Sequence, residues 1–162
     1  ANCIDWWYPN TTIAVRESEK PMPVLGFGTC CRAAALGRPL VESIKVYLAL
    51  GGRHIDTAWL YGNHQDVRTA IRESHIPRDD LWITSKIMMG FGNANFDTNH
   101  AGEPMKKAQS AADARNQIDI TLEQLGVNYL DLMLLHSPAT PSRVNTEIWR
   151  ELIEAKRKGK IR

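Results

Sequence analysis

The sequence predicts an α/β fold of the (β/α)₈ TIM-barrel type, with only the first four βα units present. Two observations carry this prediction. Short apolar segments alternate four times with longer amphipathic segments, and the short segments are apolar on both faces. Strands buried on both sides and joined by helices form parallel sheets. A complete barrel typically takes about 250 residues. The 162 residues of this chain therefore correspond to a half-barrel.

A short N-terminal extension, residues 1–12, precedes the predicted half-barrel of residues 13–162. Short apolar runs bounded by turn residues predict strands at 13–16, 24–28, 53–57, 81–86 and 130–135. Apolar positions at helical spacing predict helices at 39–50, 63–74, 105–125 and 147–158. Asn63 is expected to cap the second helix, and Gly126 to end the third. A glycine-rich loop of residues 88–104 separates the third strand from the third helix.

A doubly wound nucleotide-binding sheet is the alternative architecture. Such sheets carry a glycine-rich turn directly after the first strand. The turn in this chain reads Gly26-Phe-Gly28-Thr-Cys-Cys, which lacks the third glycine, and no P-loop pattern occurs. The barrel is therefore favoured.

Composition excludes several classes of protein. Hydrophobic residues make up 43% and charged residues 23%, which is typical of a globular chain, and no apolar run is long enough for a transmembrane segment. A net charge of +2 is too small to predict nucleic-acid binding. Cys3, Cys30 and Cys31 form no disulfide framework, so free thiols are expected. Free thiols favour the cytoplasm, or an organelle reached after removal of a targeting peptide.

Four polar residues are expected at the ends of predicted strands or in the loop after them: Asp56, Tyr61, Lys86 and His136. Reactive residues of (β/α)₈ barrels occupy these positions, so the four should meet at one mouth. Taken singly, each is more simply explained as a turn, rim, surface or core residue. Together they form an acid–base set, because a nearby ammonium favours loss of the tyrosine proton and an aspartate can hold the lysine in place. A histidine there can orient a carbonyl oxygen.

The set lacks a hydride source, which implies a nicotinamide cofactor. No metal is expected, because His100 has no metal-ligand spacing with His54, His64 or His75.

The stretch from Gly51 to Asn63, GGRHIDTAWLYGN, resembles the first signature of the aldo-keto reductases, and Leu122–Leu132 resembles the second. Ser85-Lys86 and Leu135–Pro138 match the strand ends that carry the family's lysine and histidine, and Met22–Thr29 resembles its entry into the first strand.

The resemblance implies that Tyr61 is the proton donor, that Lys86 and Asp56 tune it, and that His136 orients the substrate carbonyl. It further implies NADPH as cofactor, with Gly28 and Thr29 near the nicotinamide and Asp56 near its ribose. Gly52 and Ser137 replace aromatic residues common in the family, so the substrate pocket should be less apolar.

The family's cofactor-phosphate contacts come from the second half of the barrel, which leaves two hypotheses. The first is an NADPH-dependent reductase of small aldehydes or ketones that needs a second barrel half, with this chain inactive alone. The second is a non-catalytic half-barrel that serves as a scaffold or accessory subunit of a larger complex. A protein partner or second barrel half is expected under both.

Overall fold

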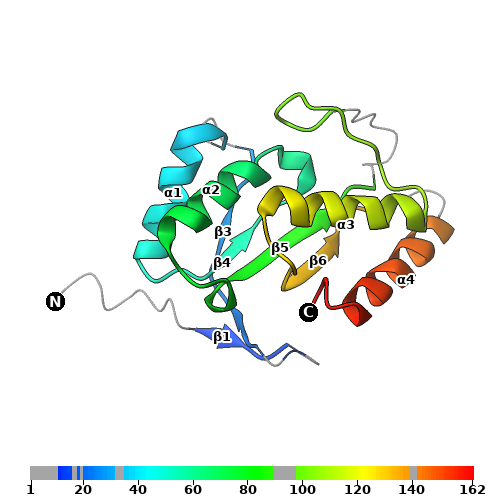
Figure 1. The fold of residues 1–162 in the computed structure, drawn as a ribbon. Helices are drawn as coiled ribbons and strands as arrows, with labels where there is room; N and C mark the ends of the chain where they lie inside the picture. Colours follow the sequence, from blue (N-terminus) through cyan, green and yellow to red (C-terminus); the bar gives the residue numbers. More distant parts are fainter. Residues whose placement is uncertain (1–10, 16–17, 19, 32–34, 90–97, 139–141) are drawn as a thin grey trace.

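The computed structural model describes residues 11–15, 18, 20–31, 35–89, 98–138 and 142–162. Their centre is a sheet of four strands: β3 (Gly26–Gly28), β4 (His54–Asp56), β5 (Trp82–Ile87) and β6 (Leu132–Leu135). All three pairings are parallel and the strand order is β3-β4-β5-β6 (Figure 1). Sequential order is that of a barrel wall, whereas a doubly wound sheet reverses its order at a switch point. The predicted parallel α/β architecture is confirmed.

The described residues form four α-helices. Successive strands are connected by α1 (Gly37–Ala49), α2 (His64–Ser74) and α3 (Ala111–Leu125), and α4 (Arg143–Arg157) follows β6. Two short 3₁₀ helices, η2 (Trp59–Tyr61) and η3 (Arg78–Asp80), lie in the connections around α2. Figure 1 shows the α-helices running alongside the sheet, in the layered arrangement of βα units. None of the described helices has the length and apolarity needed to cross a lipid bilayer.

Alternate side chains of the strands belong to different environments, as the two-residue period of a strand requires. Ile55, Ile83 and Met133 are buried in the main core together with side chains from all four α-helices. The opposite positions include polar groups. Asp56 and Thr84 are neighbours across β4 and β5, and Lys86 follows two residues further along β5. The sheet therefore has one face built for packing with the helices and another able to carry chemistry.

A two-stranded antiparallel hairpin, β1 (Thr12–Ile13) and β2 (Met22–Pro23), precedes the first barrel strand. It lies at the end of the sheet where the strands begin (Figure 1), and the Pro23 carbonyl oxygen is 3.1 Å from Nδ1 of His54, the first residue of β4. The strand predicted at 13–16 is therefore shorter than expected, and its partner β2 is a strand that the sequence analysis did not predict. The aromatic residues of the extension lie outside the described residues.

Buried Asp131 fixes the register between β5 and the approach to β6. Its Oδ2 accepts hydrogen bonds from the Ile83 backbone N–H at 2.8 Å and from Arg78 at 2.7 Å. Its Oδ1 lies 3.8 Å from Lys20 Nζ and 3.7 Å from Arg162 Nη1. The carboxylate is fully buried and is surrounded by three partly exposed cations.

Residues after α4 turn back onto the sheet. Leu130 N–H donates to the Lys160 carbonyl at 3.0 Å, and Arg162 N–H donates to the Leu130 carbonyl at 3.0 Å. Ile161 thereby forms a parallel bridge with Leu130, just before β6.

Two predicted helix boundaries are wrong. The third helix begins at Ala111 instead of residue 105, because the Ser110 hydroxyl caps it by accepting the Asp113 N–H. The fourth begins at Arg143, four residues before the predicted start. Asn63 does sit at the N-cap of α2, but its side chain makes no capping bond.

Candidate active site

Lys86 is the centre of a hydrogen-bonded cluster at the strand ends. Its Nζ lies 2.5 Å from Asp56 Oδ1, 2.9 Å from the Thr57 carbonyl oxygen and 3.1 Å from the Tyr61 hydroxyl. The three acceptors come from the end of β4 and the loop after it. The Lys86 side chain is only 12% exposed, so these three contacts, more than water, hold the ammonium group in place. Asp56, Tyr61 and Lys86 are therefore brought together as the sequence predicts.

His136 joins this cluster through the aromatic ring of Tyr61. The two rings meet edge to face, with centroids 5.6 Å apart and planes at 83°. The backbone N–H of His136 donates to the Ile87 carbonyl at 2.9 Å, so it stands one residue beyond β6, beside the end of β5. Burial, with a smaller contribution from the Lys86 charge, lowers the pKa of His136 to about 4. The imidazole is therefore neutral near pH 7.

Tyr61 reaches the cluster because of the loop that carries it. Residues 59–61 form η2, which ends at Gly62 with φ of 66°, a left-handed conformation that favours glycine. Tyr61 is 9% exposed and packs in a small apolar cluster with Trp59, Met88 and Met105. Its phenol is therefore rigidly held, with the hydroxyl directed to Lys86.

Two amide side chains that sequence reasoning did not assign to the site support it. Asn63 Nδ2 donates to the Thr29 carbonyl at 2.8 Å and to the Ala35 carbonyl at 3.0 Å, which ties the loop after β3 to the start of α2. Gln117 on α3 accepts from the Met88 N–H at 2.8 Å and donates to the Met88 carbonyl at 3.0 Å. Both amides pair with backbone groups of distant segments, so no local sequence pattern could reveal them.

The residues expected near a cofactor differ in exposure. Gly28 is exposed, pairs with Asp56 across the sheet, and a Cβ built on it would meet nothing within 4 Å. The Asp56 side chain is 35% exposed. Thr29 is 1% exposed, and its hydroxyl lies 3.0 Å from that of Thr57. Gly28 and Asp56 are thus open to a ligand, whereas the Thr29 side chain is not.

Gly52 does not lie at this mouth, which corrects the expectation that it borders the substrate pocket. It is buried and precedes β4, at the opposite end of the strand from Asp56. A Cβ there would overlap the ring of Tyr47, whose hydroxyl donates to the Leu25 carbonyl and accepts from the His54 N–H. The glycine makes room for Tyr47.

Free thiols were expected, and this is wrong for Cys30 and Cys31, which are joined as a disulfide directly after Thr29. Cys31 adopts a left-handed backbone conformation, with φ of 64°. Cys3 lies outside the described residues.

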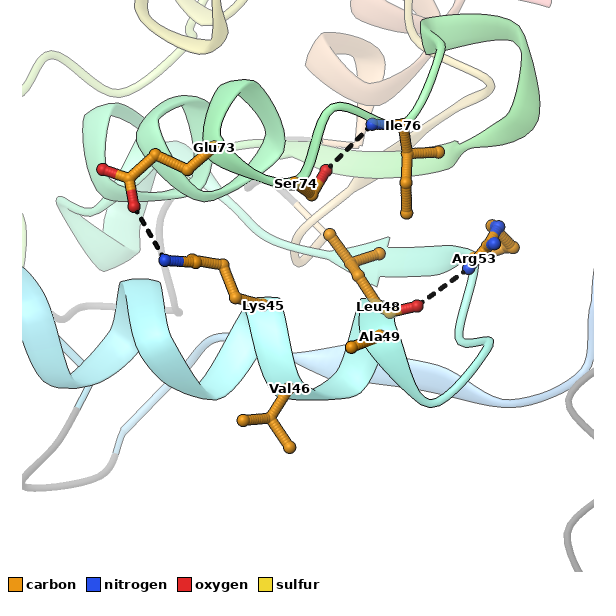
Figure 2. Close-up of a pocket in the computed structure, with 8 residues that line it drawn as sticks. All are labelled: Lys45, Val46, Leu48, Ala49, Arg53, Glu73, Ser74 and Ile76. Carbon is orange, nitrogen blue, oxygen red and sulfur yellow. Dashed lines mark hydrogen bonds and ion pairs between the residues drawn. The ribbon is translucent and has the colours of Figure 1, made fainter.

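A cavity of about 550 Å³ lies elsewhere, between α1 and α2 (Figure 2). A Lys45–Glu73 ion pair at 3.0 Å closes one side, and Arg53 donates to the Leu48 carbonyl at the other. None of Asp56, Tyr61, Lys86 and His136 lines it. This cavity is a feature of the helical layer and not of the strand ends.

Comparison with known proteins identifies the family. Residues 37–162 match the model of the aldo/keto reductase family. The chain belongs to the aldo/keto reductase family.

Among curated relatives, an NAD/NADP-dependent indole-3-acetaldehyde reductase of Schizosaccharomyces pombe is 36% identical over 78% of this chain and 38% of its own length. A 9,11-endoperoxide prostaglandin H2 reductase of Trypanosoma cruzi is 31% identical over 87% of this chain and 42% of its own. The chain thus spans less than half of these relatives.

Solved structures agree on the fold. The crystal structure of an aldo/keto reductase from Brucella melitensis aligns with a TM-score of 0.69 at 29% identity, over 93% of this chain and 51% of that chain. An aldo-keto reductase of Bombyx mori in complex with NADP aligns with a TM-score of 0.67 at 21% identity, over 88% of this chain and 45% of that chain.

Proposed function

We propose that the protein carrying this chain reduces the carbonyl group of a small aldehyde or ketone, with NADPH as the hydride source. The observation that carries the proposal is the contact line from Asp56 through Lys86 to the Tyr61 hydroxyl, with His136 against the Tyr61 ring. Here a single ammonium contacts a carboxylate, a backbone carbonyl and a phenol.

Each residue has a separate part in the proposed reaction. The Tyr61 hydroxyl gives its proton to the carbonyl oxygen as that oxygen gains negative charge. Lys86, 3.1 Å away, stabilises the tyrosinate that remains. Asp56 and the Thr57 carbonyl hold the ammonium in position. His136 is neutral because its pKa is lowered to about 4, so it can donate one N–H to the carbonyl oxygen without adding charge.

The residues present fit the nicotinamide end of the cofactor. The backbone at Gly28 is exposed and its missing side chain leaves open space beside Asp56, so a flat ring can approach closely. When bound, NADPH would supply the hydride. We propose that Gly28 and Asp56 face the cofactor and that Thr29, buried against Thr57, supports their position from beneath.

We further infer that more βα units, from the same chain or a second one, complete the barrel. Leu134, Trp149 and Ile153 on β6 and α4 are 37%, 55% and 41% exposed. A hollow of about 160 Å³ beside them is lined mainly by apolar side chains, including Trp149 and Ile153. Apolar edges of this kind are contact surfaces. A scaffold protein would also need this apolar edge to bind its partner. It would not need the contacts of Lys86 with Asp56 and Tyr61, so those contacts favour the hypothesis of an enzyme.

The test uses NADPH that carries deuterium at the transferable position. The natural protein, incubated with a panel of aldehydes and ketones, should yield alcohols that carry deuterium on the former carbonyl carbon. Mass spectrometry of the products gives the result. The absence of deuterated alcohol across the panel, for a folded protein of known solution mass, would refute the proposed reaction.

A further inference from the structure

A second hollow, of about 490 Å³, lies between the C-terminal ends of α2 and α3, before the starts of β5 and β6. The two helices are neighbours in the helical layer (Figure 1). This α2–α3 hollow is therefore at the end of the sheet opposite Asp56, Tyr61 and Lys86. Further βα units would add beside the edge strands β3 and β6, so both walls of the hollow belong to this chain.

One wall of the hollow is basic. Arg68, Arg72 and His75 line it, and their spacings of four and three residues place them on one face of α2 and its C-cap. No carboxylate of the described residues lines the hollow, and these three side chains take part in no ion pair between described residues. Arg78 lines it too, but buried Asp131, at 2.7 Å, already compensates its charge.

The acidic side chains of α2 are directed to α1 instead. Asp66 accepts the backbone N–H of Gly37 at 2.7 Å. Glu73 forms ion pairs with Arg38 and Lys45, both at 3.0 Å, and Figure 2 shows the contact with Lys45. The helix thus separates its charges. Its acidic groups are compensated by α1, whereas its basic groups near α3 keep an uncompensated positive charge.

The end of α3 holds Arg68 in place. The Arg68 Nη1 donates to the Glu123 carbonyl at 3.4 Å. Gly126, which ends α3 with φ of 66°, leaves room for the side chain, because a Cβ there would lie 2.6 Å from Arg68 Nε. One guanidinium group is therefore positioned over the end of α3, with Arg72 one helical turn further along α2.

The rest of the lining is mainly apolar. Ile71, Ile76 and Val127 pack against the main core but are only partly buried, so some of their surface remains open in the hollow. The planar guanidinium of arginine suits the oxygen atoms of phosphate. Two guanidinium groups beside an apolar wall therefore fit a phosphate that carries an organic group better than a bare ion.

We propose that the α2–α3 hollow binds a small organic phosphate monoester. Arg68 and Arg72 hold the phosphate, and the organic group lies against Ile76 and Val127. The doubly ionised phosphate compensates the charge that α2 leaves open, and a volume of about 490 Å³ is within the range of small-molecule sites. This site is additional to the proposed reductase site and does not depend on it.

The experiment titrates phenyl phosphate into the natural protein by calorimetry, at low salt and with saturating NADP⁺, which fills any site for the phosphates of the cofactor. Phenyl phosphate should bind with a Kd below about 1 mM, and more weakly as salt is added. Inorganic phosphate should bind at least about fivefold more weakly, because it has no group for the apolar wall. A Kd above about 1 mM, or equal affinities for the two ligands, would overturn the proposal.

Variants locate the binding. Arg68→Gln and Arg72→Gln should each weaken phenyl phosphate binding by about 10-fold, because each removes a charge-assisted hydrogen bond to the phosphate. Arg150→Gln is the matched control, since it removes an exposed arginine of α4 outside the hollow and should bind as the parent does. Thermal unfolding checks that each variant is folded.

Parent-like affinity in a folded variant that carries both Arg68→Gln and Arg72→Gln would overturn the site. Tyr61→Phe should bind phenyl phosphate as the parent does, because Tyr61 lies at the opposite end of the sheet. Failure of the proposed reaction would therefore be seen separately from failure of the phosphate site.

Discussion

Replacing Asp131 by asparagine should strongly destabilise the fold. The carboxylate is fully buried, and the substitution leaves Lys20, Arg78 and Arg162 without the charge that they surround. Loss of one partner from a buried ion pair typically costs about 3–5 kcal/mol. The three cations keep 21%, 20% and 39% of their side-chain exposure, so water compensates in part and the lower end, about 3 kcal/mol, is expected.

Alanine at the same position should cost more than asparagine. The asparagine oxygen can still accept the Ile83 N–H, now 2.8 Å from Oδ2, whereas alanine leaves that buried donor unpaired. An unpaired buried N–H adds about 1–3 kcal/mol. The two variants therefore separate the charge from the hydrogen bond.

The assay is urea unfolding of the natural protein followed by tryptophan fluorescence, with heat unfolding alongside. At roughly 2–4 °C per kcal/mol, the asparagine variant should melt about 6–12 °C below the parent. Asp79→Asn is the control, since the Asp79 side chain is 81% exposed and the variant should unfold close to the parent. An Asp131→Asn variant within about 1 kcal/mol of the parent would refute the burial argument.

Three other predictions follow from the site and its support. Lys86→Met should lower kcat/KM for carbonyl reduction by about 100-fold or more, because the tyrosinate loses its ammonium partner, and an unchanged rate and pH profile would contradict a role for Lys86 in the reaction. Gly52→Ala should lower the free energy of unfolding by about 1–3 kcal/mol, because the new methyl group overlaps the Tyr47 ring, while Gly28→Ala, with open space around it, should cost less in the same urea assay. Burial lowers the pKa of His64 from 6.5 to about 4. Between these pH values the unfolded chain binds more protons than the folded chain. The contribution of His64 to the free energy of unfolding should therefore fall by up to about 3 kcal/mol as pH drops from 6.5 to 4. His64→Gln should reduce that fall without abolishing it, because the pKa of His136 is also lowered to about 4, and an equally steep fall in the variant would contradict the contribution of His64.

The strand order was predictable because each βα unit repeats one hydrophobic pattern, and parallel strands joined by helices bring their carboxyl ends to one edge. That rule is enough to bring Asp56 and Lys86 to neighbouring strand ends, whereas Tyr61 reaches them through the loop after β4. It says nothing about the connections. The third helix begins late because Ser110 caps it, while Gln117 pairs with the Lys106 carbonyl in the segment expected to be helical.

The side-chain contacts between different loops could not be predicted from the sequence. Asn63 has the residue type and position of a helix cap, but it bonds to Thr29 and Ala35. His100 lies far from Cys30 and Cys31 in the sequence, yet the ligand atoms of the three side chains lie within 4.8 Å of one another. In both cases a side chain pairs with a group on a distant segment, and one sequence does not specify such pairs.

The most direct test of the proposed function is the Tyr61→Phe variant, because it removes only the hydroxyl that Lys86 contacts at 3.1 Å. Steady-state reduction of the best carbonyl substrate with NADPH is measured beside the urea midpoint. A proton donor typically contributes about 100- to 10,000-fold to the rate, so kcat/KM should fall by that range while the midpoint stays close to the parent. Activity within about threefold of the parent, in a variant that is folded, would contradict the assignment of Tyr61 as proton donor.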